Sequence, residues 1–159
     1  MSDTRPGGST DPLEFLAHQH RDVEQRWIQL EAAHEGDQDM QSQLADELVS
    51  MLLQHDAIET ELLYPALREH GGEQGEQLAE HALEEHAKVR EQLQQIEGQD
   101  PQDEQIWSVL SQCIDDVTHH VEEEETIIFP LLRENWDVDQ RIEVCGRLSE
   151  IVAAGPATG

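Results

Sequence analysis

The chain has 159 residues, of which 36 are Asp or Glu and only 9 are Lys or Arg, so its formal net charge at pH 7 is −27. An acidic surface attracts divalent cations and makes nucleic acid and anionic membranes poor partners, because contact with phosphate groups needs Lys and Arg. The length predicts one domain, and a hydrophobic content of 36% suits the narrow core of a helix bundle. Without a signal-peptide pattern or an apolar run near the ~18 residues of a membrane span, we expect a soluble cytoplasmic protein.

The elements follow from apolar periodicity and from helix start and stop signals. Residues 1–10 are rich in Gly, Ser, Thr and Pro and are predicted to be disordered. Asp11 and Pro12 then supply an N-cap and a first helical residue, and Asp100-Pro101 repeats this signal. The pattern predicts four long helices, at about 11–34, 39–70, 73–97 and 101–134. A short fifth helix is expected at about 138–153 within the segment 135–154, and the tail 155–159 is expected to be flexible.

Four long helices joined by short breaks predict an all-α fold, an antiparallel up-down-up-down four-helix bundle over residues 11–134 with a short fifth C-terminal helix. No run of alternating apolar residues favours a strand. Pro65 and Pro130 lie near the ends of the second and fourth helices, and each removes a backbone donor. We therefore expect a kink in the last turns of both helices.

One stretch occurs twice, as HDAIETELLYPALREH at 55–70 and as HVEEEETIIFPLLREN at 120–135. Each copy begins with a His followed four residues later by a Glu, namely His55 with Glu59 and His120 with Glu124. Two residues four apart on a helix differ by about 40° in azimuth, so each His and Glu point to the same place. Segment 20–31 resembles segment 86–97 at nearly the same offset, so the chain is an internal duplication with His20 and His86 as the early histidines.

The heights of these histidines in the bundle can be compared. In an antiparallel hairpin, two residues lie level when their sequence midpoint falls at the turn. The midpoints between consecutive histidines fall beside Gly36, at Gly71 and just after Pro101, which are the predicted breaks. All four histidines can therefore share one layer, and Glu59 and Glu124 inside a bundle need a cation, because a buried unpaired carboxylate costs several kcal/mol.

The ligand types indicate which metal is bound. Imidazole and carboxylate without thiolate suit iron, manganese or zinc. Two inward Glu side chains can each bridge two metal ions, as in the dinuclear carboxylate sites of four-helix bundles. We therefore expect two iron ions, with zinc and manganese as the alternatives.

Four segments together, LAHQHRDVEQ, HxxxE before LYPAL, EEHAKVREQL and HxxxEE before FPLL, resemble the hemerythrin-like family, also called the HHE cation-binding domain. The resemblance covers about residues 11–134. It implies a four-helix bundle that holds a non-haem, oxygen-bridged di-iron centre with Glu59 and Glu124 as bridges. Carried over by position, the metal ligands are His20, His55, Glu59, His86, His120 and Glu124.

The sequence departs from the oxygen-carrying members of that family on the third helix, where they have two histidines four residues apart. Here the candidate for the extra ligand, His81, lies five residues before His86, which is about 140° in azimuth. A local π-bulge would bring His81 in, and otherwise Glu85 or water would take its place. On the fourth helix Glu124 stands where the carriers have Asp one residue further along. These differences leave open whether the centre keeps a position for reversible oxygen binding.

Other residues near the motifs receive structural roles. Tyr64 and Phe129 are expected to cap the core beside the kinks, and Glu61 and Glu125 are candidate hydrogen-bond partners of the ligands. His18 and His119 should face away from the layer. Apolar neighbours are predicted to form a dry shell that favours small neutral molecules and disfavours bulky substrates; they are Ile58, Leu62, Val121 and Ile128.

The sequence thus favours a non-haem di-iron protein that binds O₂, NO or H₂O₂ for carriage, sensing or detoxification. One alternative is a di-iron enzyme that decomposes peroxide, catalase-like or peroxidase-like, or that reduces NO. Another is an iron-homeostasis or structural metal-binding protein. The sequence indicates neither a protein partner nor an electron donor, and it does not specify the oligomeric state, with which a monomer is consistent.

Overall fold

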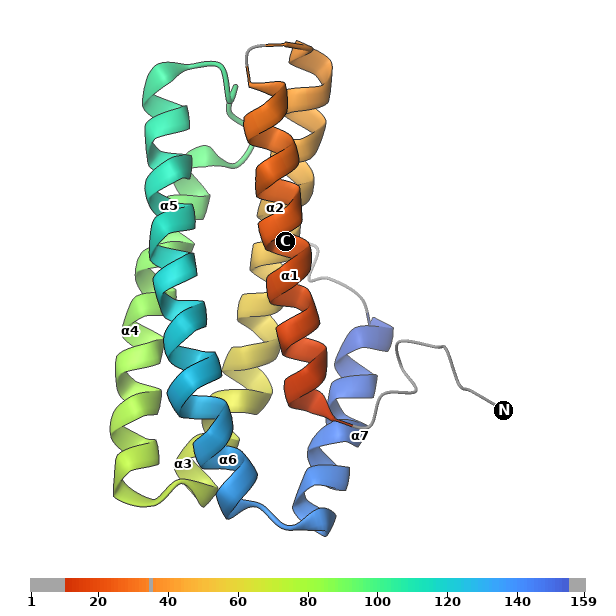
Figure 1. Ribbon diagram of the computed structural model, residues 1–159, viewed down its shortest axis with the longest axis vertical. Coiled ribbons are helices and arrows are strands. Elements are labelled where there is room, and N and C mark those ends of the chain that lie inside the picture. The colour runs from red at the N-terminus through yellow and green to blue at the C-terminus, as the bar shows by residue number, and fades with distance from the viewer. Residues whose placement is uncertain (1–10, 35, 155–159) are drawn as a thin grey trace.

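The computed structural model describes residues 11–34 and 36–154, and the predicted disordered N-terminus and flexible tail lie outside them. The described part is helical without a strand, and four antiparallel helical columns stand side by side with a fifth helix against one end (Figure 1). The predicted fold class is confirmed. The elements are α1 (Pro12–Ala33), α2 (Gln38–Ile58), η2 (Glu59–Leu63), α3 (Tyr64–His70), α4 (Gly72–Ile96), α5 (Glu104–Glu123), η3 (Glu124–Ile128), α6 (Phe129–Asn135) and α7 (Val138–Ala154).

Aspartate side chains fix several helix starts. Asp11 caps α1 by accepting a hydrogen bond from the Leu13 N–H at 2.9 Å, as predicted. The expected start of the fourth column at Asp100 is wrong, because Asp100 and Pro101 form a turn in which the Asp103 N–H donates to the Asp100 carbonyl. Asp103 is the actual N-cap of α5. Either aspartate can cap a helix, and the turn satisfies the first one locally.

The two prolines at which kinks were expected each follow a π-turn. In η2 the Tyr64 N–H donates to the carbonyl of Glu59, five residues back, and in η3 the Phe129 N–H donates to that of Glu124. A proline has no backbone N–H and cannot make the hydrogen bond to the carbonyl four residues back that an α-helix requires. A π-turn beside the proline therefore loses little hydrogen-bond energy compared with a regular α-helix. Its consequence is that residues five apart, such as Glu59 and Tyr64, come to one side of the helix.

Two apolar clusters fill the bundle, one on either side of a polar layer. The lower cluster, toward α3, α6 and α7, includes Leu13, Ile58, Leu67, Phe129 and Leu132. The upper cluster, toward the α1–α2 turn, includes Val23, Leu48, Leu93 and Leu110. The fifth helix, α7, adds Val144 and Leu148 to the lower cluster. The polar layer therefore lies inside the bundle, between two dry regions.

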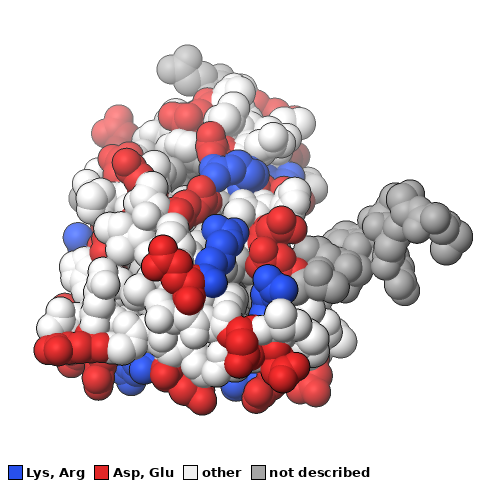
Figure 2. All heavy atoms as spheres, turned by 60° about the horizontal axis from the view of Figure 1, so that its bottom comes forward, with Lys and Arg blue, Asp and Glu red and all other residues white. Residues whose placement is uncertain are grey.

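The surface reflects the composition. Figure 2 shows acidic side chains scattered over one face among uncharged residues, with basic side chains in fewer places. Among the helices that the structure describes, none has the length and apolarity that crossing a bilayer requires.

Candidate metal centre

Each column of the bundle contributes to the polar layer. α1 supplies His20, α2 supplies His55, α4 supplies His86 and α5 supplies His120. The two π-turns begin with Glu59 and Glu124, whose side chains are 0% exposed. All six residues that the sequence singled out by symmetry are buried, and the structure brings them together in two overlapping groups that share both glutamates.

Subsite A is the group formed by His20, His55, Glu59 and Glu124. The Nε2 atoms of His20 and His55 are 3.1 Å apart. Glu59 Oε2 lies 3.0 Å from His55 Nε2, and Glu124 Oε1 lies 3.1 Å from His20 Nε2. Two nitrogens and two oxygens therefore converge on one point.

Subsite B is the group formed by His86, His120, Glu59 and Glu124. The Nε2 atoms of His86 and His120 are 3.0 Å apart. Here Glu59 uses its other oxygen, Oε1, at 3.0 Å from His86, and Glu124 uses Oε2, at 3.0 Å from His120. Each carboxylate thus presents one oxygen to each subsite, which is the arrangement of a bridging ligand.

The distances between these atoms, and the lack of a hydrogen-bond partner for two of the carboxylate oxygens, fit a pair of metal ions. Two ligand atoms at right angles around an ion, each at about 2.1 Å, lie roughly 3.0 Å from one another, which matches the separations within both subsites. Glu59 Oε2 and Glu124 Oε1 are buried without a hydrogen-bond partner in the described structure, although imidazole nitrogens lie 3.0 and 3.1 Å away. A buried carboxylate oxygen in that state is costly, and a cation between the nitrogens and oxygens removes the cost.

The outer nitrogens of the four imidazoles all meet an acceptor. The contacts of the Nδ1 atoms are His20 to Glu125 at 2.7 Å, His55 to Gln19 at 2.7 Å, His86 to Asp56 at 2.7 Å and His120 to Glu85 at 2.8 Å. Because these acceptors require a donor, Nδ1 carries the proton, and the Nε2 lone pair is left for the interior. Metal-binding histidines are held by the same kind of contact.

The sequence predicted only some of the residues that accept a hydrogen bond from the histidine Nδ1 atoms. Glu125 was expected and contacts His20, whereas Glu61, the other candidate, is exposed. Asp56 and Gln19 were missed, and Glu85, considered as a ligand, instead accepts from His120. These acceptors come from neighbouring helices, so their pairing depends on how the helices are rotated, which spacing within one helix does not specify.

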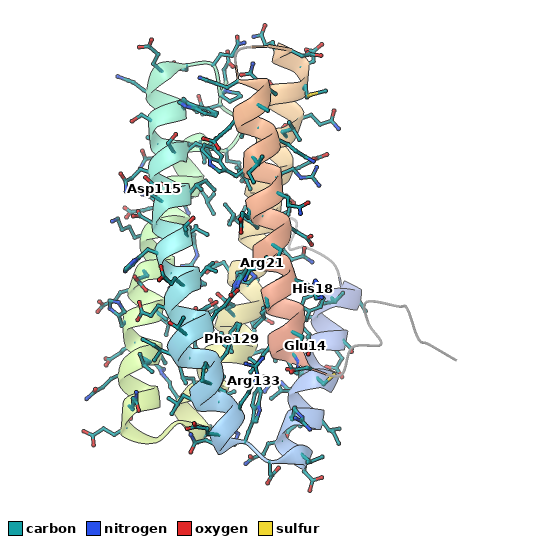
Figure 3. The ribbon with its side chains drawn as sticks, in the orientation of Figure 1. Glu14, His18, Arg21, Asp115, Phe129 and Arg133 are labelled. Atoms are coloured by element: carbon teal, nitrogen blue, oxygen red, sulfur yellow. The ribbon has the colours of Figure 1, made fainter. Side chains whose placement is uncertain are left out.

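Arginines hold two of the acceptors in place. Arg90 donates to both oxygens of Asp56, at 3.0 and 2.9 Å. Arg21 donates to Glu125. Figure 3 shows Arg21 on the side of α1 toward α5 and His18 on the side toward α7. His18 and His119 are exposed, as expected.

The hydroxyl of Tyr64 lies inside subsite B. It is 2.7 Å from His86 Nε2, 2.9 Å from His120 Nε2, 2.7 Å from Glu124 Oε2 and 3.1 Å from Glu59 Oε1. The ring packs in the lower cluster, so the expected core role is present, and the polar end adds a possible ligand that the sequence reading did not assign. The available signal was the contrast of Tyr64 with Phe129 at the equivalent place in the repeat.

Phe129 takes a different position beside subsite A. Its ring stacks on that of His20, with centroids 6.0 Å apart and an interplanar angle of 4°.

Burial raises the pKa of Tyr64 well above its usual value, and the charge of Glu59 adds to that effect. The two subsites therefore differ, because one has a phenol among its ligand atoms and the other has a hydrocarbon ring next to it.

The structure does not bring His81 to the other six residues. Its side chain is 55% exposed on α4, with Nε2 3.6 Å from Glu85 and 3.9 Å from Glu123. The π-bulge that would have turned His81 inward is absent from α4, whose described residues form one regular helix. The π-turns of this chain precede Pro65 and Pro130 instead.

The charges of the layer stabilise one another without metal. Burial alone would raise the pKa of Glu59, but His55 and the other neighbours lower it well below its usual value. Burial likewise opposes protonation of the histidines, yet hydrogen bonds to Asp56 and Glu59 raise the pKa of His86 to about 10. Glu124, by hydrogen bond and charge, raises that of His120 to about 9. The layer thus attracts positive charge, and metal ions can take the place of protons there.

The polar layer is packed against apolar side chains on one side and borders a cavity on the other. Below it, Ile58, Leu62 and Ile128 are buried in the lower cluster and form the expected dry shell. Above it, Val121 lines a cavity of about 430 Å³ together with the four histidines of the layer. Of the four residues predicted to form the dry shell, three are therefore buried as expected, and the fourth, Val121, is half-buried beside the cavity.

Comparisons with known proteins agree on one family. A family model described as Hemerythrin HHE cation binding domain matches residues 11–132. An uncharacterised hemerythrin-like protein of Schizosaccharomyces pombe is 22% identical over 125 residues, which are 79% of this chain and only 61% of the yeast protein. The crystal structure of an HHE cation-binding domain-containing protein from Mycobacterium kansasii has a TM-score of 0.69 and 21% identity, with coverage of 91% of this chain and 88% of that one. That structural likeness shows the shared fold.

Proposed function

Because this chain belongs to the hemerythrin HHE cation-binding family, we propose that its polar layer holds two iron ions and binds O₂, NO or H₂O₂. The main support for the proposal is that the two oxygens of each carboxylate face different subsites. Glu59 and Glu124 each present one oxygen to subsite A and one to subsite B. Imidazole and carboxylate donors without thiolate are suited to iron, with zinc and manganese as the alternatives.

The bound iron pair would supply electrons and open coordination positions. Each subsite offers two imidazoles and two carboxylate oxygens, fewer donors than an octahedral ion accepts, so room is left for a small ligand. The protein's own contribution is to hold the imidazoles by their Nδ1 atoms and to exclude water from below. Ile58, Ile128 and Phe129 are each at most 2% exposed and form that dry side.

Optical spectroscopy of the iron-loaded protein tests this function. The reduced protein, handled without air, should change its visible spectrum when O₂, NO or H₂O₂ is added, and the change should disappear in the double variant His55→Ala/His120→Ala. His18→Ala and His119→Ala change exposed histidines of α1 and α5 and serve as controls. If the spectrum of the iron-loaded protein responds to none of the three molecules, a structural or iron-homeostasis role is supported instead.

One observation favours a second candidate function, the decomposition of peroxide. The Tyr64 hydroxyl lies among the candidate ligand atoms, 2.7 Å from His86 Nε2 and from Glu124 Oε2, which is where a proton donor to a bound peroxide is needed. Two molecules of H₂O₂ give two of water and one of O₂, so this reaction needs no other reductant. Steady evolution of O₂ from peroxide, measured with an oxygen electrode and reduced in Tyr64→Phe, would establish the enzyme. Reversible O₂ binding without turnover would establish carriage or sensing.

A further inference from the structure

A cavity of about 430 Å³ lies between α1 and α5 against the histidine layer, and it opens partly to solvent, because exposed residues such as Arg21, Glu24 and Glu122 belong to its lining. Its floor is formed by the rings of His20, His55, His86 and His120. Its walls are apolar side chains that lie one or two helical turns from these histidines, toward the α1–α2 turn; they are Val23, Trp27, Leu52, Val89, Ile114 and Val117. We call this space the upper cavity.

The upper cavity is much larger than the proposed ligands of the iron pair need. A water molecule takes about 30 Å³ of liquid, and O₂, NO and H₂O₂ are of similar size. Pockets that bind organic molecules span roughly 300–1,000 Å³, and the cavity of about 430 Å³ falls in that range.

Stacked aromatic rings form one side of the upper cavity. Trp27, in the wall, stacks on Trp107 with ring centroids 5.2 Å apart, and Trp107 stacks in turn on His34 at 3.6 Å. These three rings join α1 to α5 at the end of the cavity away from the metal centre. A ligand in the upper cavity would therefore contact Trp27 on one side and the imidazole edges on the other.

The charges around the upper cavity select against anions. Its lining includes five carboxylates, Glu24, Asp56, Glu85, Glu122 and Glu125, and a single arginine, Arg21. That arginine is already paired with Glu24 and Glu125. The histidines of the floor also face carboxylates, His86 at Asp56 and His120 at Glu85, so a fatty carboxylate or a phosphate would find no free basic partner, and an apolar wall does not replace the hydration of a charged group.

We propose that the upper cavity binds a neutral, largely apolar organic molecule of about ten non-hydrogen atoms, such as a medium-chain alcohol or the corresponding alkyl hydroperoxide. The proposal goes beyond the binding of O₂, NO or H₂O₂, and it rests on the cavity rather than on the metal. Should the bound molecule be a hydroperoxide, its polar end would lie against the histidine floor.

A homologous series of alcohols provides the test, with calorimetry and tryptophan fluorescence as the readouts. The affinity of the full-length iron-loaded protein should rise about fourfold for each added methylene from 1-butanol to 1-octanol, because each buries apolar surface. Octanoate, of equal length but anionic at pH 8, should bind at least about tenfold more weakly. Absence of saturable octanol binding, or tighter binding of octanoate or octylamine than of octanol, would overturn the proposal.

Variants locate the binding. Val117→Trp fills the upper cavity and should abolish octanol binding, and Val89→Leu, a milder change, should weaken it several-fold. Val138→Trp introduces the same side chain on α7 at a position that is 59% exposed, and should bind like the parent. Equal binding by Val89→Leu, Val138→Trp and the parent, with loss only in a misfolded Val117→Trp, would contradict the assignment.

Metal-free protein separates this proposal from the proposed function. If the protein retains no iron yet binds octanol with the same chain-length dependence, the iron proposal fails and the cavity proposal stands. If iron is retained and octanol does not bind, the reverse holds.

Discussion

Gln19 and Glu85 make the same contact in the two halves of the chain. Each precedes the early histidine of its half, and each accepts a hydrogen bond from Nδ1 of the late histidine, Gln19 from His55 at 2.7 Å and Glu85 from His120 at 2.8 Å. The amide is neutral and the carboxylate is charged. The two halves therefore share the geometry of this contact, and subsite B has one more negative charge beside its histidines.

Removing that charge should weaken subsite B. In Glu85→Gln the acceptor oxygen remains but His120 becomes a poorer donor to the metal, so we expect metal affinity to fall by about tenfold. Chelator competition measures this, and Glu84→Gln, a neighbouring exposed change, is the matched control. Gln19→Glu should shift affinity the opposite way. Equal metal affinities for the Glu85 and Glu84 variants would show that the charge of Glu85 does not strengthen metal binding at subsite B.

Tyr64→Phe should change the metal centre without unfolding the bundle. The ring keeps its place in the lower cluster, and only the hydroxyl that lies 2.7 Å from His86 Nε2 and Glu124 Oε2 is lost. If the phenol binds ferric iron, the parent has a visible charge-transfer band that the variant lacks. Circular dichroism checks that both proteins remain helical. Identical visible spectra and identical iron contents would show that Tyr64 only packs.

Metal removal should destabilise the protein. Glu59 and Glu124 are 0% exposed, and without cations their charge is balanced only by protonated imidazoles. A ligand present at about 1,000 times its dissociation constant stabilises a fold by about 4 kcal/mol, which is about 10 °C in a domain of this size. Thermal denaturation with and without chelator measures the difference. An unchanged midpoint would mean that the layer is stable without metal.

Cys113 should resist thiol reagents until the protein unfolds. It is buried in the upper cluster, and burial, followed by the charge of Asp116, raises its pKa to about 12. Because the thiolate is the reactive form, raising the pKa lowers its population at every pH below that value. In a Cys145→Ser background, reaction at pH 8 should be slow in buffer and fast in denaturant. Rapid reaction of the folded protein would indicate an open upper cluster.

The six residues of the polar layer could be predicted from the sequence because two independent signals agree. The His-xxx-Glu spacing places each pair on one helix face, and the midpoints of the histidines coincide with the helix breaks. Helix period and chain reversal are both strongly determined by sequence. The helical fold was predictable for the same reason.

The role of Tyr64 and the size of the upper cavity could not be predicted in this way. Pro65 indicates a kink, but the π-turn before it changes the register by one residue, and only then does Tyr64 join Glu59 on one side. A similar shift would bring His81 inward, yet α4 is a regular helix without a proline. The cavity depends on how far α1 and α5 stand apart, which apolar periodicity does not specify.

The iron content of the purified, reconstituted protein tests the central claim most directly. Elemental analysis should give two iron ions per chain in the parent, about one in His86→Ala, which damages subsite B alone, and close to none in Glu59→Ala, which removes a residue shared by both subsites. A parent that holds one iron or none, or a Glu59→Ala variant that retains two, would contradict a metal pair bridged by Glu59 and Glu124.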